Sequence, residues 1–109
     1  MFYILDKNNI PVEIDFSKDI DIEIIKNLVD QRRVVRMDES CATRISTIFT
    51  GINLRGSVNH PMFFETMIFR NEELNLWGRY HSWDDAYQGH IKALEAYQSV
   101  TEGFMRMDK

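Results

Sequence analysis

The fold class of this chain is decided by the stretch PMFFETMIFR, residues 61–70. Aromatic and β-branched residues dominate it, and Pro61 stands at its first position, where a missing N–H is tolerated, so it predicts a strand. Side chains alternate between the two sides of a strand, and here both sides are apolar. The sequence therefore predicts a central strand that needs cover on both faces of its sheet.

Other segments on either side of this strand have the same character. We expect the long segment Ala42–Ile52 to pair with it antiparallel across the polar loop Asn53–His60. Short apolar runs bounded by turn residues predict the remaining strands and a small N-terminal hairpin. These strands are expected at Phe2–Leu5, Ile10–Ile14, Arg32–Met37 and Leu74–Tyr80.

Two segments have the periodicity of amphipathic helices. Asp21–Gln31 places its isoleucines, leucine and valine on one arc, although the alternation at its start also fits a strand. The second helix begins with Ser82-Trp83-Asp84-Asp85, a variant of the capping box. One stripe of this helix is expected to face the sheet, and it consists of Trp83, Ala86, Tyr87, His90, Leu94 and Tyr97.

The predicted fold class is α+β, an antiparallel sheet of about four to six strands covered by two helices. The 109 residues suit one domain, 1–109, with a tail that frays from about residue 101. Because both faces of the central strand are apolar, two helices could cover them, or one helix and a partner chain. A homodimer is therefore a further expectation.

Composition excludes several classes of function. The net charge of −4 gives no basic footprint for nucleic acid. The chain has no apolar stretch long enough to cross a membrane and no features of a signal peptide. A single cysteine, Cys41, excludes an intrachain disulfide and is typical of a reducing, cytoplasmic setting. We expect no metal site and no cofactor, because the three histidines lack ligand spacing and no phosphate-binding glycine motif occurs.

One carboxylate and one imidazole interrupt the apolar pattern. Glu65 lies within the central strand, and His90 lies near the middle of the helical stripe, beside Gly89. The favoured interpretation is a buried polar pair, since buried polar groups are normally hydrogen-bonded. The alternatives are a ligand pocket and, less favoured, acid–base catalysis; no residue is assigned as catalytic. The ligand-binding candidates are Arg44, Ser46, Thr47, Glu65, Thr66, Tyr80, Trp83 and His90.

Several segments together resemble a family of small uncharacterised proteins of bacteriophages and prophages. The family pattern is approximately V-S-T-V-F-L-G-L-D-H, then L-F-E-T-M-V-F, then R-Y-x-T-W-E-E-A-x-x-G-H. The corresponding segments here are Arg44–Ile52, Phe64–Phe69 and Arg79–His90, and the likeness spans nearly the whole chain. Asn53-Leu54 stands where the family has D-H, so chemistry that depends on that pair would be lost here. The resemblance also places Ser46, Thr47, Glu65, Thr66, Trp83 and His90 at motif positions.

The resemblance implies a phage protein that acts in the host cytoplasm, and it brings no established activity. We therefore expect an accessory binding protein, with counter-defence as its setting. Its partner would be a small signalling molecule that it sequesters, or a host protein. The alternatives are a small enzyme that uses Glu65 and His90 as an acid–base pair, and a structural or assembly protein.

Overall fold

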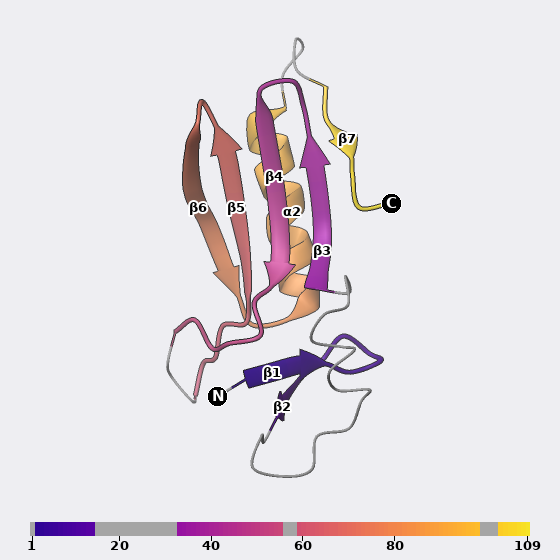
Figure 1. The fold of residues 1–109 in the computed structure, drawn as a ribbon, viewed down its shortest axis with the longest axis vertical. Coiled ribbons are helices and arrows are strands. Elements are labelled where there is room, and N and C mark those ends of the chain that lie inside the picture. The colour runs from indigo at the N-terminus through magenta and orange to yellow at the C-terminus, as the bar shows by residue number, and fades with distance from the viewer. Residues whose placement is uncertain (1, 15–32, 56–58, 99–102) are drawn as a thin grey trace.

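The computed structural model describes residues 2–14, 33–55, 59–98 and 103–109 and has an α+β fold, as predicted (Figure 1). The main sheet has five antiparallel strands in the order β6-β5-β4-β3-β7, and a separate two-stranded hairpin pairs β1 with β2. The elements are β1 (Phe2–Leu5), β2 (Pro11–Ile14), β3 (Val34–Glu39), β4 (Thr43–Phe49), β5 (Phe64–Arg70), β6 (Glu73–Tyr80), α2 (Trp83–Tyr97) and β7 (Met105–Arg106).

The strand predicted at 61–70 forms the second strand of this sheet, but it begins at Phe64 and not at Pro61. β5 pairs with β4 on one side and with β6 on the other, and the antiparallel pairing across the loop from residue 53 is confirmed. The β5–β6 connection is a tight turn in which Asn71 and Glu72 both have positive φ, 53° and 63°. Such a turn matches the twist of the flanking strands, so it sets the register of the hairpin.

Helix α2 covers one face of the sheet, and it lies behind the strands in Figure 1. It begins as predicted: the Ser82 side chain accepts a hydrogen bond from the backbone N–H of Asp85, at 3.1 Å. Its buried residues are Ala86, Gly89, His90, Ala93 and Leu94. Two apolar clusters form between helix and sheet, one around Phe64 and Phe49 and one around Ile45 and Ile68.

The β1–β2 hairpin lies at the lower end of the sheet in Figure 1. The Tyr3 and Phe63 rings are 4.5 Å apart, and the Tyr3 N–H donates to the carbonyl of Gly51 at 2.8 Å. Gly51 has a φ of 78°, a conformation that favours glycine. The hairpin thus closes the end of the cluster around Phe64, to which Leu5 belongs.

Two features differ from the sequence prediction or lie beyond it. The helix expected at Asp21–Gln31 lies outside the described residues, so the described part of the chain contains the single helix α2. The tail was expected to fray, but β7 pairs with β3 through Asp38↔Arg106 and Glu39↔Met105.

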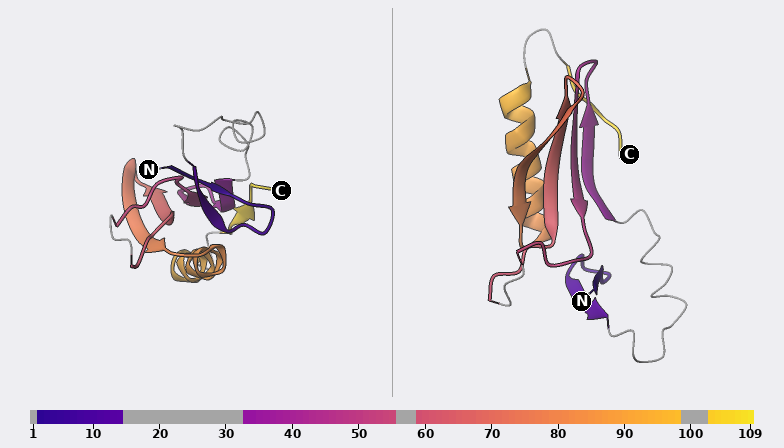
Figure 2. Two further views of the ribbon diagram at one scale, coloured as in Figure 1. Left: turned by 90° about the horizontal axis from the view of Figure 1, so that it is seen from below. Right: turned by 60° about the vertical axis from the view of Figure 1, so that its left-hand side comes forward.

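In the ranges that the structure describes, no helix is long and apolar enough to cross a membrane. Two further views show that α2 and the sheet form two layers (Figure 2).

Candidate functional site

The predicted ligand-binding residues do not form one site, because they lie on different sides of the sheet. Thr47, Thr66 and His90 are completely buried between sheet and helix. Alternation along β4 and β5 places Arg44, Ser46 and Glu65 on the opposite face. Trp83 contacts Phe64 edge-on in the core, with ring centroids 6.2 Å apart. The structure therefore brings together only part of the predicted set.

The predicted pairing of Glu65 with His90 is not formed. Glu65 stands opposite Arg79 in the β5–β6 register, and its Oε2 lies 3.6 Å from the Arg79 Nε. The Glu65 side chain is 20% exposed and lies on the face that α2 does not cover. An acid–base enzyme built on Glu65 and His90 would need both groups at one substrate, and the sheet separates them.

His90 has two other partners in the core. Its Nε2 lies 2.6 Å from Oδ2 of Asp38 on β3, and its Nδ1 lies 2.7 Å from the hydroxyl of Thr47 on β4. The Thr47 hydroxyl in turn hydrogen-bonds the Thr66 hydroxyl on β5. His90 therefore has a buried carboxylate partner, but that partner is Asp38 and not the expected Glu65.

Arg36 extends this chain of hydrogen bonds to Tyr87 on α2. Its Nε and Nη2 donate to the two oxygens of Asp38, at 2.8 and 3.3 Å, and its Nη1 donates to the Tyr87 hydroxyl at 3.0 Å. The Asp38 side chain is 3% exposed and the Arg36 side chain 17%. The buried network of Tyr87, Arg36, Asp38, His90, Thr47 and Thr66 therefore links three strands to α2.

The charges in this network follow from the pKa directions. Burial lowers the pKa of His90 below its ordinary value, and the hydrogen bond to Asp38 only partly offsets this. Burial alone would raise the pKa of Asp38, but the hydrogen bonds from Arg36 and His90 outweigh it and the pKa is lowered. At neutral pH Asp38 is therefore ionised and His90 neutral.

The proton positions can be assigned from these charges. A carboxylate only accepts, so His90 Nε2–H donates to Asp38 and Nδ1 is the acceptor of the neutral ring. The Thr47 hydroxyl must then donate to His90, and the Thr66 hydroxyl must donate to Thr47. Every hydrogen of the three central side chains is thus used within the core.

Thr47, His90 and Asp38 have the hydroxyl–imidazole–carboxylate order of a catalytic triad. A nucleophile must reach its substrate, however, and the Thr47 side chain has no exposed surface. None of the described pockets is lined by Thr47, His90 or Asp38. The contacts of this network are those of a group that organises the core, since they link β3, β4 and β5 to α2.

Tyr80 lies at the outer end of the network, in a slot between two glycines. A Cβ added at Gly89 would lie 2.2 Å from three atoms of the Tyr80 phenol, and one at Gly78 would lie 2.7 Å from its hydroxyl. A side chain at Gly89 would overlap the Tyr80 phenol, which accounts for a glycine in the middle of α2, whereas one at Gly78 would displace only the end of the phenol.

The Tyr80 hydroxyl is buried and has no hydrogen-bond partner among the described residues. Burial raises its pKa, and the nearby Thr66 hydroxyl offsets part of this rise. The Thr66 hydroxyl donates its hydrogen to Thr47, so its oxygen can still accept a hydrogen bond. Tyr80 is therefore close to Thr66 of the buried network and also lines the surface outside it.

That surface is a groove between β6 and α2, with a volume of about 420 Å³. We call it the β6–α2 groove. Its apolar part comes from Met62, Trp77 and the Tyr80 ring, and Gly78 and Gly89 let strand and helix approach closely. The polar residues that complete the lining are Arg79, His81, Asp85, Gln88 and Lys92.

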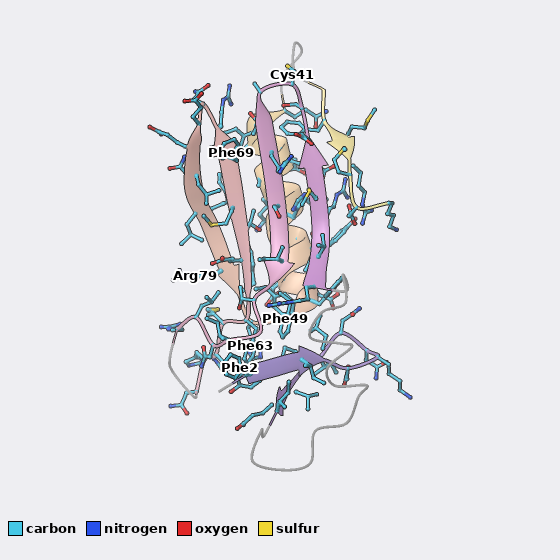
Figure 3. All side chains as sticks on the ribbon, viewed as in Figure 1. Phe2, Cys41, Phe49, Phe63, Phe69 and Arg79 are labelled. Carbon is cyan, nitrogen blue, oxygen red and sulfur yellow. The ribbon has the colours of Figure 1, made fainter. Side chains whose placement is uncertain are left out.

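The remaining predicted residues have local roles. Arg44 forms an exposed ion pair with Glu39, at 3.2 Å, beside the β3–β4 turn that carries the exposed Cys41 (Figure 3). Among the residues that the structure describes, no group of three or more histidine, cysteine or acidic side chains could hold a metal ion.

Sequence reasoning missed Asp38, Arg36 and Tyr87 as members of the polar network. The predicted strand ended at Met37, one residue before Asp38, whereas β3 continues to Glu39. Tyr87 was predicted on the stripe of α2 that faces the sheet, but its hydroxyl had no assigned partner. The signal that could have found Asp38 was a carboxylate adjoining an apolar strand, together with a buried histidine that needed a partner.

No protein-family model, no curated protein and no solved structure matches this chain. The resemblance to small phage proteins therefore stays a prediction.

Proposed function

We propose that this chain is a small binding protein and that the β6–α2 groove holds its ligand. The observation that carries the proposal is the pair of glycines on facing elements, Gly78 and Gly89, with the Tyr80 phenol seated between them. Glycine inside a helix costs about 1 kcal/mol relative to alanine. The glycine in α2 lowers helix stability, and in return it gives the groove an aromatic wall, the Tyr80 ring.

The chemistry of the groove favours a planar ligand with polar edges. Its volume of about 420 Å³ lies in the range of roughly 300–1,000 Å³ that is typical of small-molecule sites. The Trp77 side chain is 41% exposed and offers an aromatic surface for stacking. On the helix, Gln88 can both donate and accept hydrogen bonds and Lys92 carries a positive charge. A nucleobase that carries an anionic group meets these requirements.

The biological setting comes from the resemblance to phage proteins. In that setting the protein would sequester a small signalling molecule in the cytoplasm of the infected host. Sequestration needs affinity and abundance but no catalytic group, which agrees with a core whose hydroxyl, imidazole and carboxylate are all engaged. The groove therefore supports the binding function more strongly than the enzymatic alternative.

The test uses the fluorescence of Trp77. The chain has two tryptophans, so Trp83→Phe leaves Trp77 as the only one. We expect quenching on titration with adenosine mono- and cyclic nucleotides, and loss of this response in the Gln88→Ala/Lys92→Ala double variant. Glu95→Ala, an exposed change on α2 outside the groove, is the control and should bind like the parent.

A flat titration with every nucleotide would refute a nucleotide ligand. Equal binding by the parent and the double variant would place the ligand outside the groove. Any true ligand must also raise the melting temperature by mass action, so thermal unfolding gives an independent check.

A protein partner is the second candidate, and a different surface favours it. The sheet face opposite α2 exposes Phe69, Leu74 and Leu76, with 47%, 63% and 48% of their surfaces accessible. Contiguous exposed apolar side chains of this kind mark interaction surfaces. A structural or assembly role would use the same face.

A further inference from the structure

The face of the sheet opposite α2 is apolar and is covered by none of the described elements (Figures 1 and 3). Phe69 stands opposite Leu74 in the β5–β6 register, and Met67 stands opposite Leu76. These neighbours form one patch across two strands, flanked on β4 by Ser46. We call this surface the uncovered face.

We propose that a second copy of this chain covers the uncovered face, in a symmetric homodimer that packs sheet against sheet. The arrangement of charge on this face supports it. Arg44 stands opposite Phe69, two residues to one side of the Ser46–Met67 pair, and Glu65 stands opposite Ile48, two residues to the other side. The positive charge of Arg44 and the negative charge of Glu65 therefore lie two residues above and two residues below the Ser46–Met67 pair.

A twofold axis that crosses the strands at the Ser46–Met67 level exchanges these two positions. It places Arg44 of one copy beside Glu65 of the other, one strand spacing of about 4.8 Å across. By symmetry this contact forms twice, and Met67 meets its own counterpart. An axis along β5 would instead place Glu65 against Glu65, so the charges select the crossing axis.

Arg44 and Glu65 can exchange their present ion-pair partners for these contacts. The Arg44–Glu39 and Glu65–Arg79 pairs measure 3.2 and 3.6 Å, and the Arg44 and Arg79 side chains are 51% and 46% exposed. Exposed pairs of this kind contribute little, so exchanging partners in a dimer loses little. Arg79 can then lay its aliphatic stem over Leu74 of the partner copy.

The size of the face predicts the strength of the dimer. Four strands about 4.8 Å apart and seven residues long, at about 3.4 Å each, give roughly 450 Å² for each copy. The total of roughly 900 Å² lies below the roughly 1,200 Å² at which stable interfaces begin, in the range of weak and transient complexes. We therefore expect a dissociation constant in the micromolar range, with the two β6–α2 grooves on the outer surfaces of the dimer.

Edge pairing through β6 is a poorer route to a dimer. The strand is eight residues long, but it carries a register shift opposite Thr66 and Met67. Such a bulge interrupts the alternation of side chains and protects a sheet edge from pairing. The uncovered face has no such interruption on β4 and β5.

Sedimentation equilibrium of the full chain over a concentration series tests the proposal. We expect a monomer–dimer equilibrium that Phe69→Asp abolishes. Arg44→Glu alone and Glu65→Arg alone should each weaken association by at least about tenfold, because each places like charges together. The double variant Arg44→Glu/Glu65→Arg should recover most of the parent affinity. Glu95→Arg, an exposed position on α2 on the opposite side of the sheet and outside the groove, is the matched control and should associate like the parent.

Circular dichroism and urea unfolding establish that each variant is folded. A chain that is monomeric at every concentration would overturn the proposal and favour a host protein as the occupant of this face. A dimer in which the two charge reversals add their losses would overturn the crossing axis. Both outcomes are independent of nucleotide binding in the β6–α2 groove, so neither bears on the proposed function.

Discussion

Replacing Asp38 by asparagine tests whether the buried network stabilises the core. The carboxylate accepts three hydrogen bonds, two from Arg36 and one from His90, at 2.8, 3.3 and 2.6 Å. Asparagine keeps the shape and one acceptor oxygen, but its NH₂ group must point at a donor of Arg36 or of His90. The variant therefore loses at least one charge-assisted hydrogen bond and leaves the Arg36 charge without a neutralising partner in the core.

The magnitude follows from these contacts. A hydrogen bond to a charged group is worth about 1.5–3 kcal/mol, and breaking a buried ion pair costs about 3–5 kcal/mol. We expect Asp38→Asn to lower the free energy of unfolding by roughly 3 kcal/mol, a large part of the roughly 5–15 kcal/mol of a typical domain. Urea unfolding followed by tryptophan fluorescence measures it.

The control is Glu39→Gln, the neighbouring position, where the carboxylate is 37% exposed and pairs with the exposed Arg44. It should change stability by less than about 0.5 kcal/mol. If Asp38→Asn cost no more than Glu39→Gln, the buried network would contribute nothing to stability and the assignment of its charges would be wrong.

Three further variants test other parts of the core. The pKa of His90 is lowered in the folded protein. As the pH falls below about 6.5, the unfolded chain therefore takes up a proton at this residue before the folded chain does. The free energy of unfolding should drop there by at most about 1.4 kcal/mol per pH unit. In His90→Gln this slope between about pH 7 and about pH 5 should vanish in urea titrations, and an unchanged slope would refute the assignment. Gly89→Ala should destabilise by roughly 2 kcal/mol despite its better helix propensity, because the new Cβ overlaps the Tyr80 ring; a gain in melting temperature would contradict the packed slot. Ser82→Ala removes the N-cap hydrogen bond and should cost about 1 kcal/mol in urea unfolding, and no loss would mean that solvent replaces the cap.

The helix and its orientation were predictable because their signals are local. The capping serine and the 3.6-residue periodicity define where α2 begins and which stripe faces the sheet, and His90 is on that stripe as predicted. The hairpin strands were predictable for the same reason, since turn residues lie directly between apolar runs. Strand ends were less predictable: β3 continues to Glu39, where residues from the tail pair with it through β7.

The partner of His90 could not be predicted from periodicity alone. Side chains of a strand alternate with period two, so a strand with two apolar faces has two equally acceptable orientations. In β5 this left Glu65 or Thr66 as the group that faces the helix. The structure selects Thr66, and the reason lies on other strands: Thr47 on β4 hydrogen-bonds both Thr66 and His90, and Asp38 on β3 hydrogen-bonds His90.

The hydrogen bonds that turn Thr66 toward the helix also connect the core to the β6–α2 groove. A slip of one residue in β4 would move Thr47 to the uncovered face and remove the hydroxyl partner of His90. A slip in β5 would move Thr66 there and remove the hydroxyl that bonds Thr47. The hydrogen bonds of His90 thus define both the register of the strands and the position of α2 along them. Gly89 directly precedes His90, so a helix held at His90 necessarily places Gly89 over Tyr80. We infer that the buried network acts on the groove by positioning its glycine, which explains why a polar chain is retained in a core that apolar residues could fill.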